Sequence, residues 1–136
     1  MIRKVMNKQL EFQTTKKRQL INITPDVQSA LQESNTTEGI CLIFIPHATA
    51  AVLINEDEPG FKADIDKLIG MWIPDADWQH NRVDDNATSH LASALIGQSR
   101  CVPVKDGRLQ LGTWQQVFLV ELDGPRSSRR VTVSVV

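Results

Sequence analysis

Four short β-type segments separated by tight turns fill residues 99–136, and no other feature of the chain constrains its fold as strongly. The segments cover about 99–104, 108–111, 115–122 and 129–136. Asp106-Gly107 and Asp123-Gly124-Pro125 lie between them, and both are strong turn formers. The last segment alternates valines with Thr132 and Ser134, which is typical of a strand with one buried face. Because such short turns join antiparallel strands, the C-terminal part predicts an antiparallel sheet.

The first half of the chain adds further strands and one helix. Residues 2–13 and 18–24 are expected to be strands, and a helix is expected from Thr24, as N-cap, and Pro25 to about Asn35. ICLIFI, at residues 40–45, is apolar throughout, so we expect a strand covered on both faces. A further strand is expected after Pro46. Alternate side chains of a strand lie on the same face, and the proline is expected to make the strand irregular beside it. That face would carry His47, Thr49, Ala51, Leu53 and Asn55.

Two more helices are expected in the middle of the chain. Residues 60–72 carry an apolar stripe at helical spacing, formed by Phe61, Ile65, Leu68, Ile69 and Trp72. Residues 87–96 carry a second stripe, formed by Ala87, His90, Leu91, Ala94 and Leu95. The second stripe predicts that His90 points into the core. Asn86 is expected to cap this helix and Gly97 to end it.

The order of these elements predicts an α+β fold: a single compact domain over residues 1–136, with mainly antiparallel sheet and two to three helices. A formal net charge of −1 offers no electrostatic footprint for nucleic acid or an anionic membrane. No segment is long and apolar enough to cross a membrane, and no signal-peptide core is recognisable, so a cytoplasmic location is expected. Cys41 and Cys101 lie in apolar stretches without a CxxC spacing, and we expect both to be buried.

The three histidines are the candidates for chemistry. Two of them also have an ordinary explanation: His90 as a hydrogen-bonded core residue, and His80 as a surface residue of a polar loop. His47 follows the apolar strand, close to other polar side chains that would need partners there. Three imidazoles that leave one coordination position open are a known catalytic zinc arrangement. We therefore expect His47, His80 and His90 to bind one divalent cation; Zn²⁺ is favoured, although imidazole suits Ni²⁺ as well.

The chain closely resembles the YjbQ family, also called the secondary thiamine-phosphate synthase family. Three segments carry the resemblance: PHATAAVLINEDEP, WQHNRVDDNATSHLASALIG and VPVKDGRLQLGTWQQVFLVELDGPR. It extends from about residue 40 to the C-terminus, and the preceding residues are compatible with it.

The resemblance implies a YjbQ-like α+β domain that assembles as a homotrimer, with the histidines lining a cleft. It implies catalytic roles for Asn55 and Glu56. It implies substrate-binding roles for Thr49, Asn86, Arg108, Thr113, Trp114 and Gln115. The chain departs from the family pattern at Ala48, where many relatives carry a threonine, and this removes one hydroxyl from the expected site.

The resemblance further implies a weak thiamine-phosphate synthase activity, in which a thiazole phosphate displaces pyrophosphate from an activated pyrimidine. Such a transferase needs anion donors and a cation that neutralises the leaving group. The start of helix 87–96 offers backbone N–H groups for a phosphate, and Trp114 offers a ring for stacking. Taken alone, Trp114 favours a place in the core, Arg108 favours solvent, and no DDxxD-like carboxylate pair for Mg²⁺ is present in the sequence.

Two classes of function stay open on the sequence. The first is a small trimeric metal-binding enzyme that acts on a phosphorylated small molecule, a thiamine-phosphate synthase-like transferase being one form of it. The alternative is a non-catalytic metal- or ligand-binding module whose trimer is the functional unit. A turnover measurement on metal-loaded protein separates the two.

Overall fold

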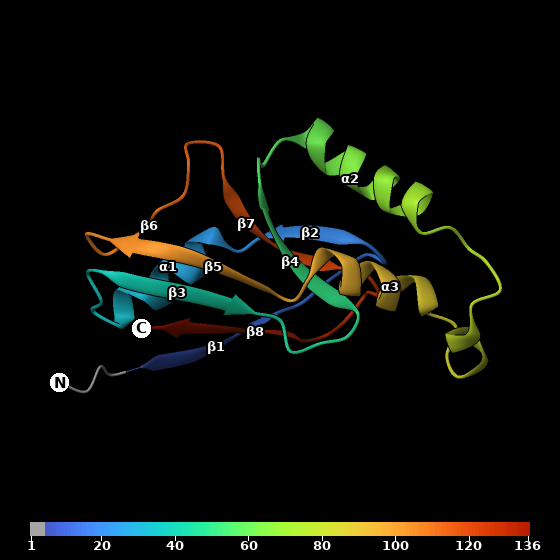
Figure 1. Ribbon diagram of the computed structural model, residues 1–136, viewed down its shortest axis with the longest axis horizontal. Helices are drawn as coiled ribbons and strands as arrows, with labels where there is room; N and C mark the ends of the chain where they lie inside the picture. The colour runs from blue at the N-terminus through green and yellow to red at the C-terminus, as the bar shows by residue number, and fades with distance from the viewer. Residues whose placement is uncertain (1–4) are drawn as a thin grey trace.

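A computed structural model describes residues 5–136 as two antiparallel sheets and three α-helices (Figure 1). The larger sheet has the strand order β1 (Met6–Phe12), β8 (Arg129–Val135), β3 (Gly39–Phe44), β5 (Ser99–Lys105) and β6 (Arg108–Leu109). The smaller sheet has the order β2 (Gln19–Asn22), β7 (Gln116–Glu121) and β4 (Ala50–Asn55). The α+β class is confirmed, and so are the four C-terminal strands; residues 2–4 of the first expected strand lie outside the described residues.

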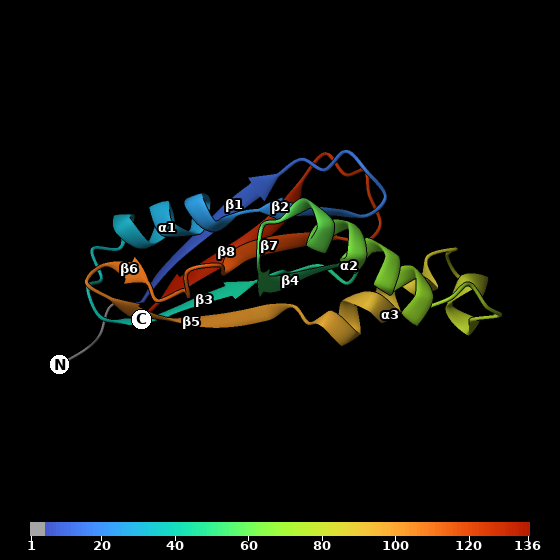
Figure 2. The same cartoon turned by 90° about the horizontal axis from the view of Figure 1, so that it is seen from above.

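The helices lie on two sides of the smaller sheet. They are α1 (Thr24–Glu33), α2 (Pro59–Trp72) and α3 (Ala87–Ile96), and a 3₁₀ turn, η1 (Gln79–Arg82), precedes α3. Both views place β6 and α1 at one end of the molecule and η1 with the start of α3 at the other (Figures 1 and 2). None of the described helices is both long and apolar enough to span a membrane.

Two apolar clusters hold these layers together. The larger cluster lies between the sheets and includes Ile23, Leu31, Ile43, Leu119 and Val133, from α1 and from both sheets. The smaller cluster lies on the other face of the small sheet, where α2 and α3 cover it; its buried members are Ala51, Ile69, Ile73, Ala92, Val120 and Leu122. The small sheet is therefore buried on both faces, which explains the continuous apolar sequence of β7.

The larger sheet is covered on one face only, so the prediction that residues 40–45 are buried on both faces is wrong. Cys41, Ile43 and Ile45 point into the core and are fully buried. The alternate side chains of β3 face outward, with exposed fractions of 51% for Ile40, 38% for Leu42 and 42% for Phe44. Their partners across β5 include Pro103 and Cys101, and Cys101 is exposed, contrary to expectation.

Helix α3 turns a different face to the core from the one that its apolar stripe predicts. The buried residues of the helix are Ala87, Ser89, Ala92 and Ser93, whereas Leu91 and Leu95 are 36% and 58% exposed. The physical reason is close packing: the hydroxyls of Ser89 and Ser93 donate to the carbonyl oxygens of Leu122 and Ala50, at 2.6 and 2.7 Å. Only small side chains allow the helix to approach the sheet backbone this closely.

The apolar stripe of α2 is also only partly buried, since Leu68 and Trp72 are exposed.

Neither of the two predicted N-cap residues caps its helix with its side chain. Helix α1 begins at Thr24, one residue earlier than expected, and the Thr24 hydroxyl accepts a hydrogen bond from the Val117 backbone at 2.8 Å. Asn86 stands at the cap position of α3, but its side chain makes no cap bond. The Asn81 side chain accepts from the Ala87 N–H instead, at 2.9 Å. The Asn86 side chain is thereby free for other contacts.

Candidate functional site

The His80 and His90 rings lie side by side at the amino end of α3, with centroids 4.2 Å apart and planes inclined by 55°. His80 belongs to η1, and His90 lies in the first turn of α3. Both side chains are partly exposed. The short loop between the two elements folds back on itself, and this brings together two histidines that are ten positions apart in the sequence.

Asn86 connects this histidine pair to the loop after β7. Its Oδ1 lies 2.9 Å from His80 Nε2, and its Nδ2 donates to Asp123 Oδ2, also at 2.9 Å. Asn86 is buried, with 9% of its surface exposed. A side chain with both ends bonded and little room to turn holds the His80 ring in a defined orientation.

Asp123 is a functional candidate that the sequence reasoning missed. Its carboxylate forms ion pairs with Lys17 and with Arg126, the latter at 3.0 Å. Burial works to raise the pKa of Asp123, but the hydrogen bonds from Asn86 and Lys17 outweigh it and lower the pKa. A Cβ at Gly124 would lie 2.1 Å from the Lys16 carbonyl oxygen, so glycine lets this turn approach the Lys17 segment. The sequence by itself marks this aspartate only as a turn residue, in Asp123-Gly124-Pro125.

His47 lies in the turn before β4, where Pro46 was expected to disturb the strand. Its Nε2 accepts a hydrogen bond from the Arg130 backbone N–H at 2.8 Å. Partial burial lowers the pKa of His47, and the charges of Arg129 and Arg130 lower it further. The imidazole is therefore neutral at pH 7, with its proton on Nδ1. His47 and Thr49 precede the regular strand, so the irregularity expected beside Pro46 is present, and the face expected for a regular strand begins only within β4.

A buried ion pair anchors the same turn. Glu121 has no exposed surface and Arg129 has 4%, and the Arg129 Nη2 lies 2.5 Å from Glu121 Oε2. The same guanidinium donates to the Thr49 hydroxyl at 2.9 Å, and Thr14 donates to Glu121 at 2.7 Å. A glutamate inside the apolar run VFLVEL was the signal that could have revealed this network, because a buried carboxylate requires a partner.

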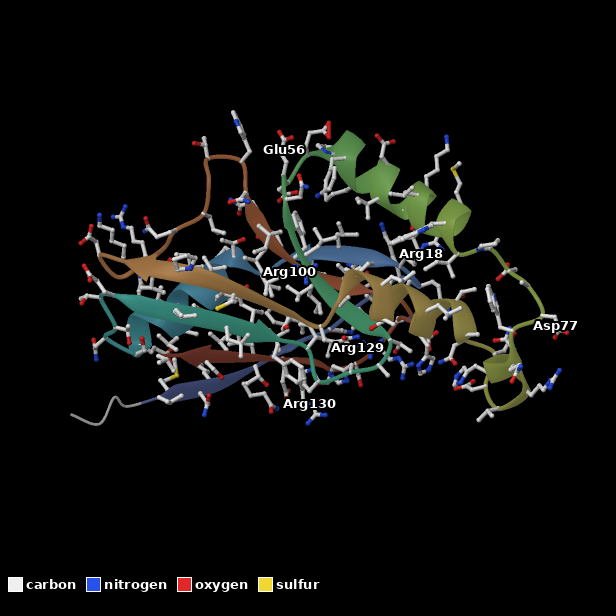
Figure 3. The ribbon with its side chains drawn as sticks, in the orientation of Figure 1. Arg18, Glu56, Asp77, Arg100, Arg129 and Arg130 are labelled. Atoms are coloured by element: carbon white, nitrogen blue, oxygen red, sulfur yellow. The ribbon has the colours of Figure 1, made fainter. Side chains whose placement is uncertain are left out.

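The predicted catalytic residues lie at the other end of β4. Thr49 directly precedes this six-residue strand, and Asn55 and Glu56 lie at its far end, about 20 Å away at ~3.3 Å per residue. Figure 3 shows Arg129 near the beginning of β4 and Glu56 just beyond its end. The extended strand therefore keeps Asn55 and Glu56 away from Thr49.

Glu56 shares its end of the small sheet with the loop before β7. A shallow pocket there is lined by Glu56, Asp57, Thr113, Trp114 and Gln116, together with neighbouring residues. The Trp114 ring is 72% exposed, so its expected place in the core is wrong. The Gln115 side chain folds back to accept from the Gly112 N–H at 2.8 Å, which shapes this loop.

Arg108 belongs to neither group. It is exposed on β6, at the end of the molecule away from α3 (Figure 1), where it lines a shallow groove with Gln28 and Leu109. The predicted site residues are thus brought together only in part: Thr49 lies beside His47 through the Arg129 network, and Asn86 lies beside His80.

Two of the three histidines are arranged so that both could bind one cation. His80 Nδ1 and the His90 ring have no hydrogen-bond partner among the described residues. The Nε2 lone pair of His47 is engaged by the Arg130 N–H and is not free for a metal ion. Within residues 5–136, no three side chains of His, Cys, Asp or Glu stand in an arrangement that would hold a metal ion.

The sequence of residues 8–136 matches the family model described as UPF0047 protein YjbQ-like. The chain belongs to this family. The YjbQ-like relatives include a UPF0047 protein of Methanothermobacter thermautotrophicus, 43% identical over 96% of this chain and 92% of that protein. They also include YugU of Bacillus subtilis, 40% identical over 90% of this chain and 93% of that protein.

Solved structures of YjbQ-like proteins have the same fold. A YbjQ-like protein of unknown function from Sulfolobus solfataricus superposes with a TM-score of 0.94 at 44% identity, covering 97% of this chain and 96% of that one. An uncharacterised YjbQ-family protein from Clostridium acetobutylicum superposes with a TM-score of 0.90 at 34% identity, covering 95% and 99%.

Proposed function

We propose that this YjbQ-like chain is a metal-dependent enzyme that acts on a small phosphorylated molecule at the amino end of α3. The adjacent His80 and His90 rings, 4.2 Å apart, carry this proposal. Metal–nitrogen bonds of ~2.1 Å place two neighbouring imidazole ligands with their centroids about 5 Å apart, so a small ring movement would admit an ion. Zn²⁺ is the favoured ion, with Ni²⁺ next.

The surroundings of the histidine pair favour an anionic substrate. The partial positive charge of the α3 amino end lies at this position and favours an anion there. Lys17 and Arg126 flank Asp123 nearby and add positive charge. A phosphate oxygen or water would supply the remaining ligands of the ion, and His47 would contribute if the Arg130 contact opened.

A homotrimer is part of the proposal. Asn55, Glu56 and Trp114 lie too far from His80 to act on the same molecule within one copy of the chain. In a cyclic trimer, each interface joins two different surfaces of neighbouring copies. The exposed Leu91 and Leu95 continue along the helix that carries His90, so a neighbouring copy seated on them would lie beside the histidine pair.

Metal content and turnover test the proposal together. Elemental analysis of the wild type should find about one divalent ion per chain, and His80→Ala and His90→Ala should each abolish it. A turnover screen of the loaded protein should include an activated pyrimidine pyrophosphate with a thiazole phosphate. Stoichiometric metal without turnover of any phosphorylated compound would favour the non-catalytic binding module. A wild type that binds no metal would overturn the metal-dependent enzyme.

A further inference from the structure

We propose that Asp123 is a positioning residue that acts through Asn86 to fix the proton of His80 on Nε2 and leave Nδ1 free for a ligand. The role of Nδ1 as a ligand atom rests on the proposed function above. The position of the proton does not, because it follows from the hydrogen-bond network of the chain alone.

The first step is the orientation of the Asn86 amide. The Asp123 carboxylate is ionised beside Lys17 and Arg126, so it can only accept hydrogen bonds. Of the two ends of the Asn86 amide, only the NH₂ group can donate to it, which agrees with the 2.9 Å contact from Nδ2 to Oδ2. The amide oxygen must then point the other way, towards His80.

The second step is the proton of His80. An amide oxygen cannot donate, so the 2.9 Å contact between Asn86 Oδ1 and His80 Nε2 requires the proton to be on Nε2. A neutral imidazole carries one proton, and its lone pair is therefore on Nδ1. Because Asn81 caps α3 through the Ala87 N–H, the helix start does not compete for the Asn86 oxygen.

His47 shows that the tautomers are set separately in this protein. There the Arg130 N–H donates to Nε2, which places the proton on Nδ1, the opposite of the arrangement at His80. A hydrogen-bonded neighbour that fixes the tautomer and ring orientation is the usual support for a metal-binding or catalytic histidine.

Nitrogen NMR of the imidazole side chains tests the inference on metal-free wild type at about pH 8.5, where imidazoles are neutral. His80 should be the Nε2–H form and His47 the Nδ1–H form. A wild-type His80 in the Nδ1–H form would overturn the inference, whatever the variants do.

Two variants separate positioning from a structural role. Asp123→Ala removes the acceptor for the Asn86 NH₂ group, so the amide should turn its oxygen towards Lys17 and Arg126, and His80 should shift towards Nδ1–H. Asp123→Asn keeps an acceptor oxygen and should retain Nε2–H. The His47 form is the internal control for folding. An Asp123→Ala protein with unchanged His47 and unchanged His80 would contradict the inference.

A metal titration then distinguishes this inference from the proposed function. Asp123→Ala should weaken Zn²⁺ binding by about 10- to 100-fold, and Asp123→Asn by much less. The expected tautomers without any Zn²⁺ binding would leave the positioning intact and remove the metal-dependent function. Tight Zn²⁺ binding with an affinity unchanged in Asp123→Ala would leave the metal-dependent function intact and would contradict the positioning role of Asp123.

Discussion

At the scale of single residues, His47 shows how local surroundings select one protonation state. Burial and the charges of Arg129 and Arg130 lower its pKa below the ordinary value of 6.5, and the Arg130 N–H needs the Nε2 lone pair. The unfolded chain therefore binds a proton more readily than the folded one. The stabilisation that the folded protein gains from a neutral His47 is complete above pH 6.5. It decreases as the pH falls towards the lowered pKa of His47 in the folded protein.

The His47→Gln variant should lose this pH dependence, since glutamine Oε1 can accept from the Arg130 N–H without titrating. Melting temperatures of the chelator-treated proteins at about pH 7.5 and at about pH 5 measure the pH dependence of stability. These two pH values lie on either side of the ordinary histidine pKa. The wild type should lose more stability on acidification than the variant. Equal losses in the two proteins would show that His47 does not contribute.

The buried Glu121–Arg129 pair provides a second prediction at this scale. Arg129→Ala would leave the Glu121 carboxylate buried without its counter-ion, and the free energy of unfolding should fall by about 3–5 kcal/mol. Urea denaturation measures the change. Arg130→Ala is the matched control, because this neighbouring side chain is exposed, and it should change stability by no more than about 0.5 kcal/mol. Similar losses in both variants would contradict the assignment.

At the scale of elements, α3 packs through small side chains and leaves its leucines outside. Ala92 is 1% exposed against the smaller apolar cluster, whereas Ala94 is exposed on the same helix. Ala92→Leu should therefore overpack the contact and lower the free energy of unfolding by about 1–3 kcal/mol.

The Ala94→Leu variant is the control for this substitution, with the same helix propensity and the same added volume. Because Ala94 lies beside Leu91 and Leu95 on the surface proposed for the trimer interface, both variants are compared in a Leu42→Lys background, which is expected to be monomeric. There Ala94→Leu should change the free energy of unfolding by no more than about 0.5 kcal/mol. Urea denaturation of the two variants measures the difference. If Ala94→Leu were the more destabilising, the sequence stripe rather than the structure would describe the packing face.

At the scale of the whole molecule, several apolar surfaces of residues 5–136 have no cover. One is the outer face of β3 with Ile40, Leu42 and Phe44, and another follows α3 with Leu91 and Leu95; α2 also exposes Leu68 and Trp72. A cyclic trimer joins two different surfaces at every interface, and we expect it to use the β3 and α3 surfaces, since the latter continues from the histidine pair. We expect the wild type to have three times the chain mass of 15.2 kDa in light scattering on a sizing column.

The variants Leu42→Lys and Leu95→Lys should each be monomeric, because each destroys one of the two surfaces. Mixed together, they keep one intact surface of each kind and should form a heterodimer but no trimer. Gln32→Lys, on the exposed face of α1, is the control and should remain a trimer. If Leu95→Lys stayed trimeric, α3 would not be part of the interface.

The sequence by itself determined the elements and the family. Turn residues such as Asp106-Gly107, both with positive φ, and the alternation in residues 131–135 mark local structure directly, because backbone preference and side-chain period act over a few residues. The positions of α2 and α3 followed in the same way. The family resemblance depended on motif residues that are contiguous in the chain, and the comparisons confirmed it.

Only the tertiary structure decided which faces are buried and which candidate residues meet. The apolar stripe of α3 was an unreliable guide to its buried face, because two serine hydroxyls bonded to backbone carbonyls made the small-residue side the closer fit. Asp123 reached Asn86 through a contact across 37 positions, which no local pattern encodes. Glu56 and Thr49, seven positions apart, lie at opposite ends of β4 because an extended strand keeps its two ends apart.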